Sequence, residues 1–168
     1  DEALNDARIA VGVCSASTKE AVTKVLEITL GPQRVEQLDV CILGDDVSAK
    51  KPDPMIYNEA RKRLHIDDPQ KCVVVEDSMV GLRAAKAAGM KCIITYTSST
   101  EQEDFYGEGA DAKVPDLASR DVTLDSIFQP YFQVVEGGDI NGKGSLDNVQ
   151  ILVGKKDPSS IEAMPGKV

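Results

Sequence analysis

The strongest constraint on the fold is residues 72–89, where a short apolar segment leads directly into a helical pattern. Residues 72–75 (CVVV) are apolar and mostly β-branched, which is typical of a buried strand in a parallel sheet. Ser78 offers an N-cap for the next helix, and Gly89 marks the end of its alanine-rich segment. The run therefore predicts a buried strand followed by a helix, which is the repeating unit of α/β proteins.

The same alternation extends over most of the chain. Further strands are predicted at 8–14, 40–43, 91–96 and 111–114, and helices at about 18–30, from Pro54 onward and at 121–128. Because such strands assemble in parallel, we expect an α/β fold with a Rossmann-like, doubly wound parallel sheet within residues 1–128. Residues 129–168 lack periodicity and indicate a tail of uncertain order, although 149–153 (VQILV) could form a strand.

Ser15 lies in the turn between a predicted strand and the helix that follows it. Ser17 and Glu20 have the spacing of a capping box, so we expect the helix to begin at Ser17 and the Ser15 hydroxyl to stay free. Unpaired N–H groups at such a turn, together with the helix dipole, can bind a phosphate. A serine at this place is more often a simple cap, so the turn alone is weak evidence.

Lys51 lies in the segment 49–54 (AKKPDP). Pro52 disfavours helical geometry at Lys51, and Asp53 and Pro54 provide a cap and a first position for the next helix. We therefore expect Lys51 on a stiff turn at the edge of the sheet, where its point charge suits a phosphate oxygen. The simpler alternative is a solvated loop lysine, which is our interpretation of Lys50.

Glu76 and Asp77 follow the strand of the 72–89 run, at the edge of the sheet where α/β proteins bind ligands. Adjacent carboxylates repel each other unless a cation or a proton intervenes, and a hard divalent metal suits them. Alternatively, one acid caps the helix and the other is solvated. Because the carboxyl ends of parallel strands share one edge, Ser15, Lys51 and the acid pair should converge into a metal-assisted phosphate site.

Composition restricts the partners and the compartment. The formal net charge of −9 argues against nucleic acid or an anionic membrane as the partner, and no apolar run approaches the roughly 20 residues that span a bilayer. Cysteines 14, 41, 72 and 92 lack the short spacings of a zinc site, so we expect buried free thiols in a reducing, intracellular compartment. The single histidine, His65, is expected on the surface at a basic helix end.

Three segments, in this order, resemble motifs of the haloacid dehalogenase-like (HAD) hydrolases. The resemblance is closest to the CbbY-like and β-phosphoglucomutase-like subgroup, which includes plant plastid members. Residues 13–17 (VCSAS) are similar to the second motif, 50–52 (KKP) to the third and 73–90 (VVVEDSMVGLRAAKAAGM) to the fourth. The fourth motif is specific over its length, and the resemblance covers roughly residues 5–128.

The resemblance implies a role for each site residue. Ser15 and the amide of Ala16 would bind the transferring phosphoryl group, and Lys51 would neutralise it together with the nucleophile. Asp77 would ligate Mg²⁺, and Glu76 would support the metal or its waters. Such enzymes form a phosphoaspartate, so the implied activity is that of a Mg²⁺-dependent phosphatase. Its substrate would be a small sugar phosphate, with xylulose bisphosphate implied by the CbbY-like branch.

The sequence departs from the family because it contains no DxDxT-like nucleophile motif. In the family, that motif and a helical cap precede the part that residues 1–128 resemble, and its strand lies centrally, between those ending at Ser15 and Glu76. We therefore expect a truncated core, in which these two strands either pair with each other or leave a loose fold prone to association.

Two consequences follow from this departure. The alternative function is an inactive fragment or splice form that retains phosphate or metal binding or has a regulatory role. Plastid members of the subgroup make the chloroplast stroma the expected location, while the oligomeric state and the exact substrate are left open.

Overall fold

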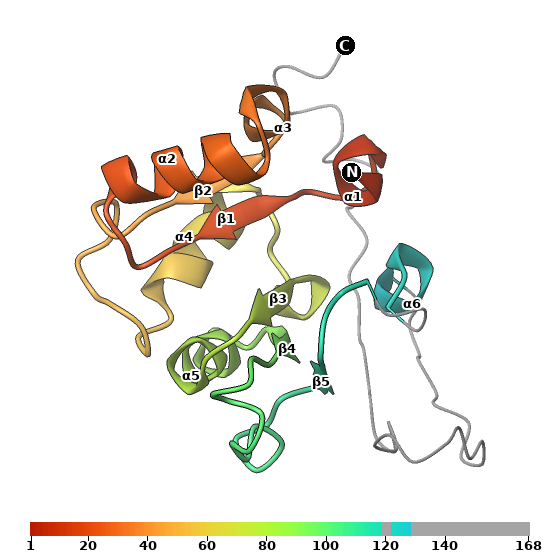
Figure 1. The fold of residues 1–168 in the computed structure, drawn as a ribbon. Helices are drawn as coiled ribbons and strands as arrows, with labels where there is room; N and C mark the ends of the chain where they lie inside the picture. The colour runs from red at the N-terminus through yellow and green to blue at the C-terminus, as the bar shows by residue number, and fades with distance from the viewer. Residues whose placement is uncertain (119–121, 129–168) are drawn as a thin grey trace.

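The computed structural model describes residues 1–118 and 122–128, and Figure 1 shows their arrangement. The elements follow in the order α1 (Glu2–Asn5), β1 (Gly12–Cys14), α2 (Lys19–Thr29), α3 (Pro32–Glu36), β2 (Val40–Ile42), α4 (Met55–Arg63), η1 (Pro69–Lys71, a 3₁₀ helix), β3 (Val73–Glu76), α5 (Met79–Ala87), β4 (Lys91–Thr95), β5 (Ala112–Val114) and α6 (Leu124–Phe128). The predicted tail at 129–168 and the possible strand at 149–153 lie outside the described residues.

The strands form two parallel sheets. β1 pairs with β2, with Val13 opposite Cys41, and β3 pairs with β4, with Val74 opposite Cys92. β5 pairs with the other side of β4, also in parallel. Helices connect most consecutive strands, so the predicted α/β class with parallel strands is confirmed.

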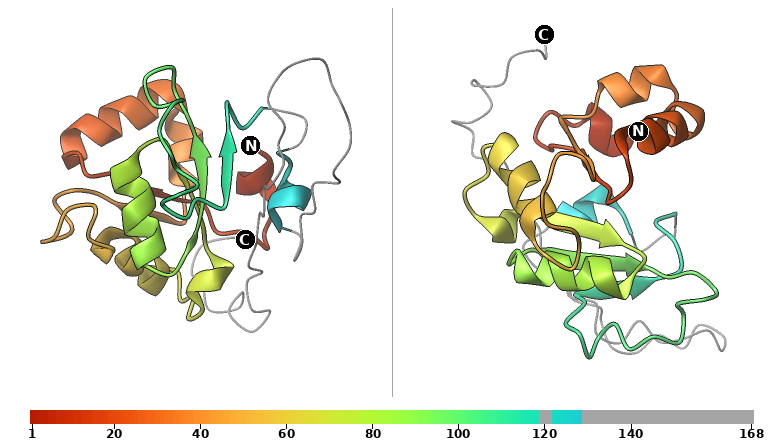
Figure 2. Two further views of the ribbon diagram at one scale, coloured as in Figure 1. Left: turned by 90° about the horizontal axis from the view of Figure 1, so that it is seen from below. Right: turned by 90° about the vertical axis from the view of Figure 1, so that its left-hand side faces the viewer.

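Two helices join the sheets through a shared hydrophobic core. α4 packs on β1 and β2, α5 packs on β3 and β4, and the two helices contact each other. Ile56 of α4 and Leu82 of α5 are fully or almost fully buried in a core that also contains Ile42 and Ile94 from the two sheets. Figure 2 shows α1 and α6 on the opposite side of the β3–β4–β5 sheet from α5.

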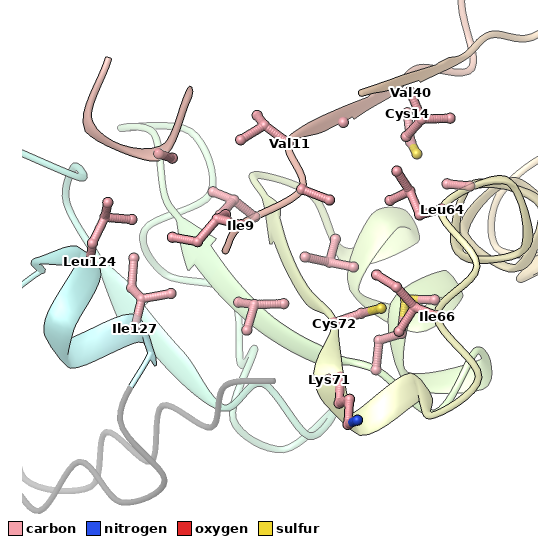
Figure 3. Close-up of a pocket in the computed structure, with 18 of the residues that line it drawn as sticks. Ile9, Val11, Cys14, Val40, Leu64, Ile66, Lys71, Cys72, Leu124 and Ile127 are labelled. Carbon is pink, nitrogen blue, oxygen red and sulfur yellow. The ribbon is translucent and has the colours of Figure 1, made fainter. Parts of the chain in front are cut away.

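A cavity of about 600 Å³ separates β1 from β3. Among the described residues these strands do not pair with each other, so the first of the two alternatives, closure of the gap by pairing, is not observed. Apolar side chains from both sheets line the cavity, including Val11, Cys14, Leu64 and Cys72, and Figure 3 shows them around it.

The backbone groups of β1 and β3 alternate between the paired edge and the cavity edge. The N–H of Ser15 donates to the carbonyl of Ile42 at 3.0 Å, and the N–H of Lys91 donates to the carbonyl of Cys72 at 3.2 Å. Because alternate residues of a parallel strand bond to the same neighbour, the intervening residues face the cavity. These are Gly12 and Cys14 of β1 and Val73 and Val75 of β3.

We predict that amide hydrogen exchange alternates along both strands. The amides of Cys14 and Val75 face the cavity and should exchange roughly tenfold or more faster than those of Val13 and Val74, which lie on paired edges. Residue-resolved exchange measured by NMR provides the comparison, with Val13 and Val74 as internal controls. Equal protection of both sets would show that the cavity edges are paired in solution.

Several element boundaries differ from their predicted positions. The strand expected at 8–14 is confined to Gly12–Cys14, because the N–H of Val11 donates instead to the side chain of Asp39 at 2.8 Å. α4 begins at Met55, and its N-cap is Pro54 where Asp53 was predicted. The carboxylate of Asp53 still accepts from the N–H of Met55 at 2.9 Å, so its capping function is retained.

The structure can be compared with two expectations from composition, one about the cysteines and one about membrane-spanning segments. All four cysteines are free, but only Cys92 is buried, while Cys14, Cys41 and Cys72 are partly exposed. Burial raises the pKa of the Cys92 thiol to about 12. Within the described part of the chain, no helix has both the length and the apolar character needed to cross a membrane.

Candidate functional site

The carboxyl ends of β1 and β3 meet the loop before α4 at one pocket. Its lining comprises Cys14, Ser15, Ala16, Lys51, Val75, Glu76, Asp77, Ser78, Val80 and Thr95. The structure therefore brings together all five predicted site residues, which come from three separate segments. Parallel strand direction explains this meeting, because it places the carboxyl ends of β1 and β3 at the same edge.

The Ser15 turn differs in detail from its prediction. The N-cap of α2 is Thr18, not Ser17, and the Thr18 side chain makes no capping hydrogen bond. Instead, Asp45 from the loop after β2 accepts from the N–H of Lys19 at 2.9 Å. The Ser15 hydroxyl oxygen accepts from the N–H of Ser17 at 3.2 Å, so the hydroxyl is not free, although it can still donate to a ligand.

Lys51 is held inside the site and is not a solvated loop lysine. Its ammonium group donates to the carbonyl of Cys14 at 3.2 Å and to the carboxylate of Glu76, with which it forms an ion pair. The Lys51 and Glu76 side chains are only 11% and 10% exposed. Lys51 also lies 4.9 Å from the centre of the Tyr57 ring, within range of a cation–π interaction. These contacts link the end of β1 to the end of β3.

The two adjacent acids have different environments. Glu76 receives hydrogen bonds on both carboxylate oxygens, from Lys51 and Tyr57 on Oε1 and from the Ser78 hydroxyl on Oε2. Asp77 is exposed at the pocket, and no ion pair or hydrogen bond engages its carboxylate within residues 1–118 and 122–128. Ser78 is the predicted N-cap of α5, and its hydroxyl oxygen accepts from the N–H of Gly81 at 3.1 Å. Asp77 is therefore the acid open to a ligand.

Cys14 also borders the pocket, but its thiol is a poor nucleophile. Burial raises the pKa of Cys14 to about 11, despite an opposing effect of the nearby Lys51 ammonium group. Since the thiolate is the reactive form, little of it exists near neutral pH. We therefore do not expect Cys14 to act as a nucleophile near neutral pH.

Three residues that have structural roles at the site were not identified from the sequence. Tyr57 lies within α4 and Gly81 within α5, and no local pattern distinguishes either residue from its neighbours. Gly44 has no space for a side chain, because an added Cβ would lie 2.3 Å from the carbonyl oxygen of Ala16. A glycine directly after a buried strand is the one signal that could have indicated Gly44. His65, in contrast, is exposed as predicted.

The pocket can bind an anion beside a cation. Ala16, which is exposed, and the hydroxyl of Ser15 precede the N-terminus of α2, and Lys51 adds a positive charge. Asp77 adds an oxygen ligand of the kind that Mg²⁺ prefers. Among the described residues, no group of three or more His, Cys, Asp or Glu side chains lies close enough together to hold a metal ion.

A parallel α/β fold with these groups at one edge of its strands is typical of phosphoryl-transfer proteins. The haloacid dehalogenase-like hydrolase family matches residues 2–89, just over half of the 168 residues, and the chain belongs to this family. The CBBY-like protein of Arabidopsis thaliana is 52% identical over 112 residues, which are 67% of this chain and 34% of that protein. Protein CbbY of Cereibacter sphaeroides is 38% identical over 101 residues, which are 60% and 44% of the two chains.

Solved structures agree with this assignment. CbbY from Rhodobacter sphaeroides, in a variant form complexed with xylulose-(1,5)bisphosphate, is 36% identical with a TM-score of 0.60, covering 66% of this chain and 48% of that one. A putative β-phosphoglucomutase from Thermotoga maritima is 32% identical with a TM-score of 0.59, covering 67% and 52%. The predicted resemblance to CbbY-like HAD hydrolases is confirmed. The chain spans about a third to a half of the length of these relatives.

Proposed function

We propose that this chain carries the phosphate- and metal-binding part of a HAD-type phosphatase. The observation that carries the proposal is the contact of Lys51 with both Cys14 and Glu76. This contact connects the turn at Ser15 and Ala16, where phosphate would bind, to the acid pair. Membership of the hydrolase family and the likeness to CbbY support the same reaction class.

The phosphate would bind at the end of β1. The Ser15 hydroxyl and the Ala16 amide donate to its oxygens, and Lys51 neutralises part of its charge. Lys51 is already shielded from water by the Tyr57 ring and by its contacts, which makes its charge act more strongly on a bound anion. Ser15 and Lys51 are therefore the residues of this chain that we assign to catalysis.

Mg²⁺ fits the donors that this chain presents. Asp77 is exposed and unengaged within the described part of the chain, whereas the Glu76 oxygens already receive hydrogen bonds from three side chains. Asp77 would hold the metal directly, and Glu76 would support it or its waters. When bound, Mg²⁺ would supply neutralising charge for the phosphate oxygens.

A small sugar phosphate is the proposed substrate, with xylulose bisphosphate as the first compound to test. The CbbY complex with xylulose-(1,5)bisphosphate supports this class, as does a validoxylamine A 7′-phosphate phosphatase that is 37% identical over 99 residues. Similarity to Arabidopsis thaliana proteins, together with the plastid members of the subgroup, supports a location in the chloroplast stroma.

The nucleophile of this proposed reaction is not among the 168 residues, since no two aspartates stand two positions apart in the DxD spacing. We propose that the phosphoaspartate forms on a residue outside this sequence. The alternative is an inactive fragment or splice form that retains phosphate or metal binding, or has a regulatory role, without turnover.

Binding and turnover can be separated with one substrate. We expect the 168-residue chain to bind xylulose-1,5-bisphosphate in a Mg²⁺-dependent manner by calorimetry and to release no inorganic phosphate from it. Phosphate release that depends on Lys51 would show that another acid of this chain serves as nucleophile. Absence of both binding and release would contradict the proposed phosphate and metal site.

A further inference from the structure

The carboxylate of Glu76 is held by groups from two helices and a loop. The Tyr57 hydroxyl of α4 and the Lys51 ammonium group both donate to Oε1. The Ser78 hydroxyl, at the N-cap of α5, donates to Oε2 at 3.2 Å. Tyr57 is only 5% exposed, so this contact is formed inside the protein and not at its surface. A carboxylate with this many donors has little freedom to move.

Gly81 provides the space in which this carboxylate lies. A Cβ added at Gly81 would lie 2.0 Å from both Cδ and Oε2 of Glu76. The φ angle of Gly81 is outside the left-handed range, so its backbone does not itself require glycine. The position excludes a side chain because of the carboxylate, and an alanine would otherwise stabilise the helix.

Tyr57 acts on Lys51 as well as on Glu76. Its ring lies 4.9 Å from the Lys51 ammonium group, and its hydroxyl reaches the carboxylate that this ammonium group pairs with. Because the Glu76 carboxylate can only accept, the Tyr57 hydroxyl is the donor in this hydrogen bond. One side chain thus orients both members of the ion pair.

We propose that Tyr57 and Gly81 are positioning residues of the phosphoryl-transfer site. Tyr57 fixes Glu76 and Lys51 through its hydroxyl and ring, and Gly81 keeps open the space for the Glu76 carboxylate. This arrangement leaves Asp77 open to the metal and aims Lys51 at the turn that contains Ser15. The inference rests on the proposed function for its ligands, but the arrangement of Lys51 and Glu76 can be tested without them.

The test uses the full chain with Tyr57→Phe and Gly81→Ala. Tyr57→Phe keeps the ring and removes only the hydroxyl, and Tyr106→Phe is the matched control because Tyr106 is 47% exposed and does not line the pocket. The first readout is proton exchange at the Lys51 ammonium group, followed by ¹⁵N NMR in the ligand-free chain. The second is the affinity for Mg²⁺ and for inorganic phosphate, measured by calorimetry.

We expect faster exchange at the Lys51 ammonium group and about tenfold weaker Mg²⁺ binding in both variants, as is usual when a group that orients a metal ligand is lost. Tyr106→Phe should match the unmodified chain, and both variants should remain folded by circular dichroism. Ammonium exchange unchanged in Tyr57→Phe would overturn the inference, whatever the ligands do. If the unmodified chain binds neither Mg²⁺ nor phosphate, the proposed function fails, while the exchange rates still decide the roles of Tyr57 and Gly81.

Discussion

Replacing Lys51 by alanine is expected to lower the free energy of unfolding by about 3 kcal/mol and to abolish phosphate binding. The change removes the cation from a buried ion pair and leaves the Glu76 carboxylate, which is 10% exposed, without a compensating charge. The loss should lie at the lower end of the range for such changes, because Tyr57 and Ser78 still donate to Glu76. Urea denaturation and calorimetric titration with inorganic phosphate measure the two effects.

The adjacent lysine provides the control. Lys50 is exposed and makes one hydrogen bond, to the carbonyl of Gly44 at 2.8 Å, so Lys50→Ala should cost no more than about 1 kcal/mol. Adding Glu76→Gln to Lys51→Ala should restore part of the stability, since the unpaired charge is removed. Similar losses in the two lysine variants would contradict the special position of Lys51.

Gly44→Ala is expected to disrupt the turn at Ser15 and Ala16, where we propose that phosphate binds. The new Cβ would lie 2.3 Å from the carbonyl oxygen and 2.9 Å from the carbonyl carbon of Ala16, and backbone atoms cannot move aside cheaply. The turn is also tied to Gly44 through the N–H of Gly44, which donates to the carbonyl of Ser17 at 2.9 Å. We expect at least roughly tenfold weaker phosphate binding and a stability loss of about 2 kcal/mol from overpacking.

A second glycine gives the matched comparison for this variant. A Cβ at Gly107 would meet the end of the Asp104 side chain at 2.2 Å, in an exposed loop that does not line the pocket. Because that side chain can rotate away, Gly107→Ala should leave phosphate affinity unchanged. Calorimetry and thermal melts of both variants provide the data. Normal phosphate binding by Gly44→Ala would show that the Ala16 turn does not hold the anion.

Much of the fold could be predicted because local patterns determine it. The β-branched segment at 72–75, the cap at Ser78 and the stop at Gly89 each depend on neighbouring residues, and β3 and α5 form close to where they were expected. Parallel pairing then follows from the alternation of strands and helices. The convergence of Ser15, Lys51 and the acid pair follows in turn from parallel pairing.

The remaining features depend on contacts between distant segments. Tyr57 meets Glu76 across 19 positions and Asp45 caps α2 across 26, and no local pattern contains these distances. The capping box at Ser17 failed because Asp45 supplied an alternative acceptor to the first turn of α2. The open cavity between β1 and β3 was not predicted, since the two outcomes considered were pairing of these strands or a loose fold. Packing of α4 against α5 explains why the sheets stay together without direct pairing.

A titration of the ¹⁵N-labelled chain with inorganic phosphate and then with Mg²⁺, followed by amide chemical shifts, tests the central claim most directly. The account predicts that phosphate shifts the amides of Ser15 and Ala16, and that Mg²⁺ shifts those of Asp77 and Ser78. Lys51→Ala should abolish the phosphate response. Shifts confined to the basic end of α4, at 61–63, or scattered over the surface would contradict a phosphate and metal site at the ends of β1 and β3.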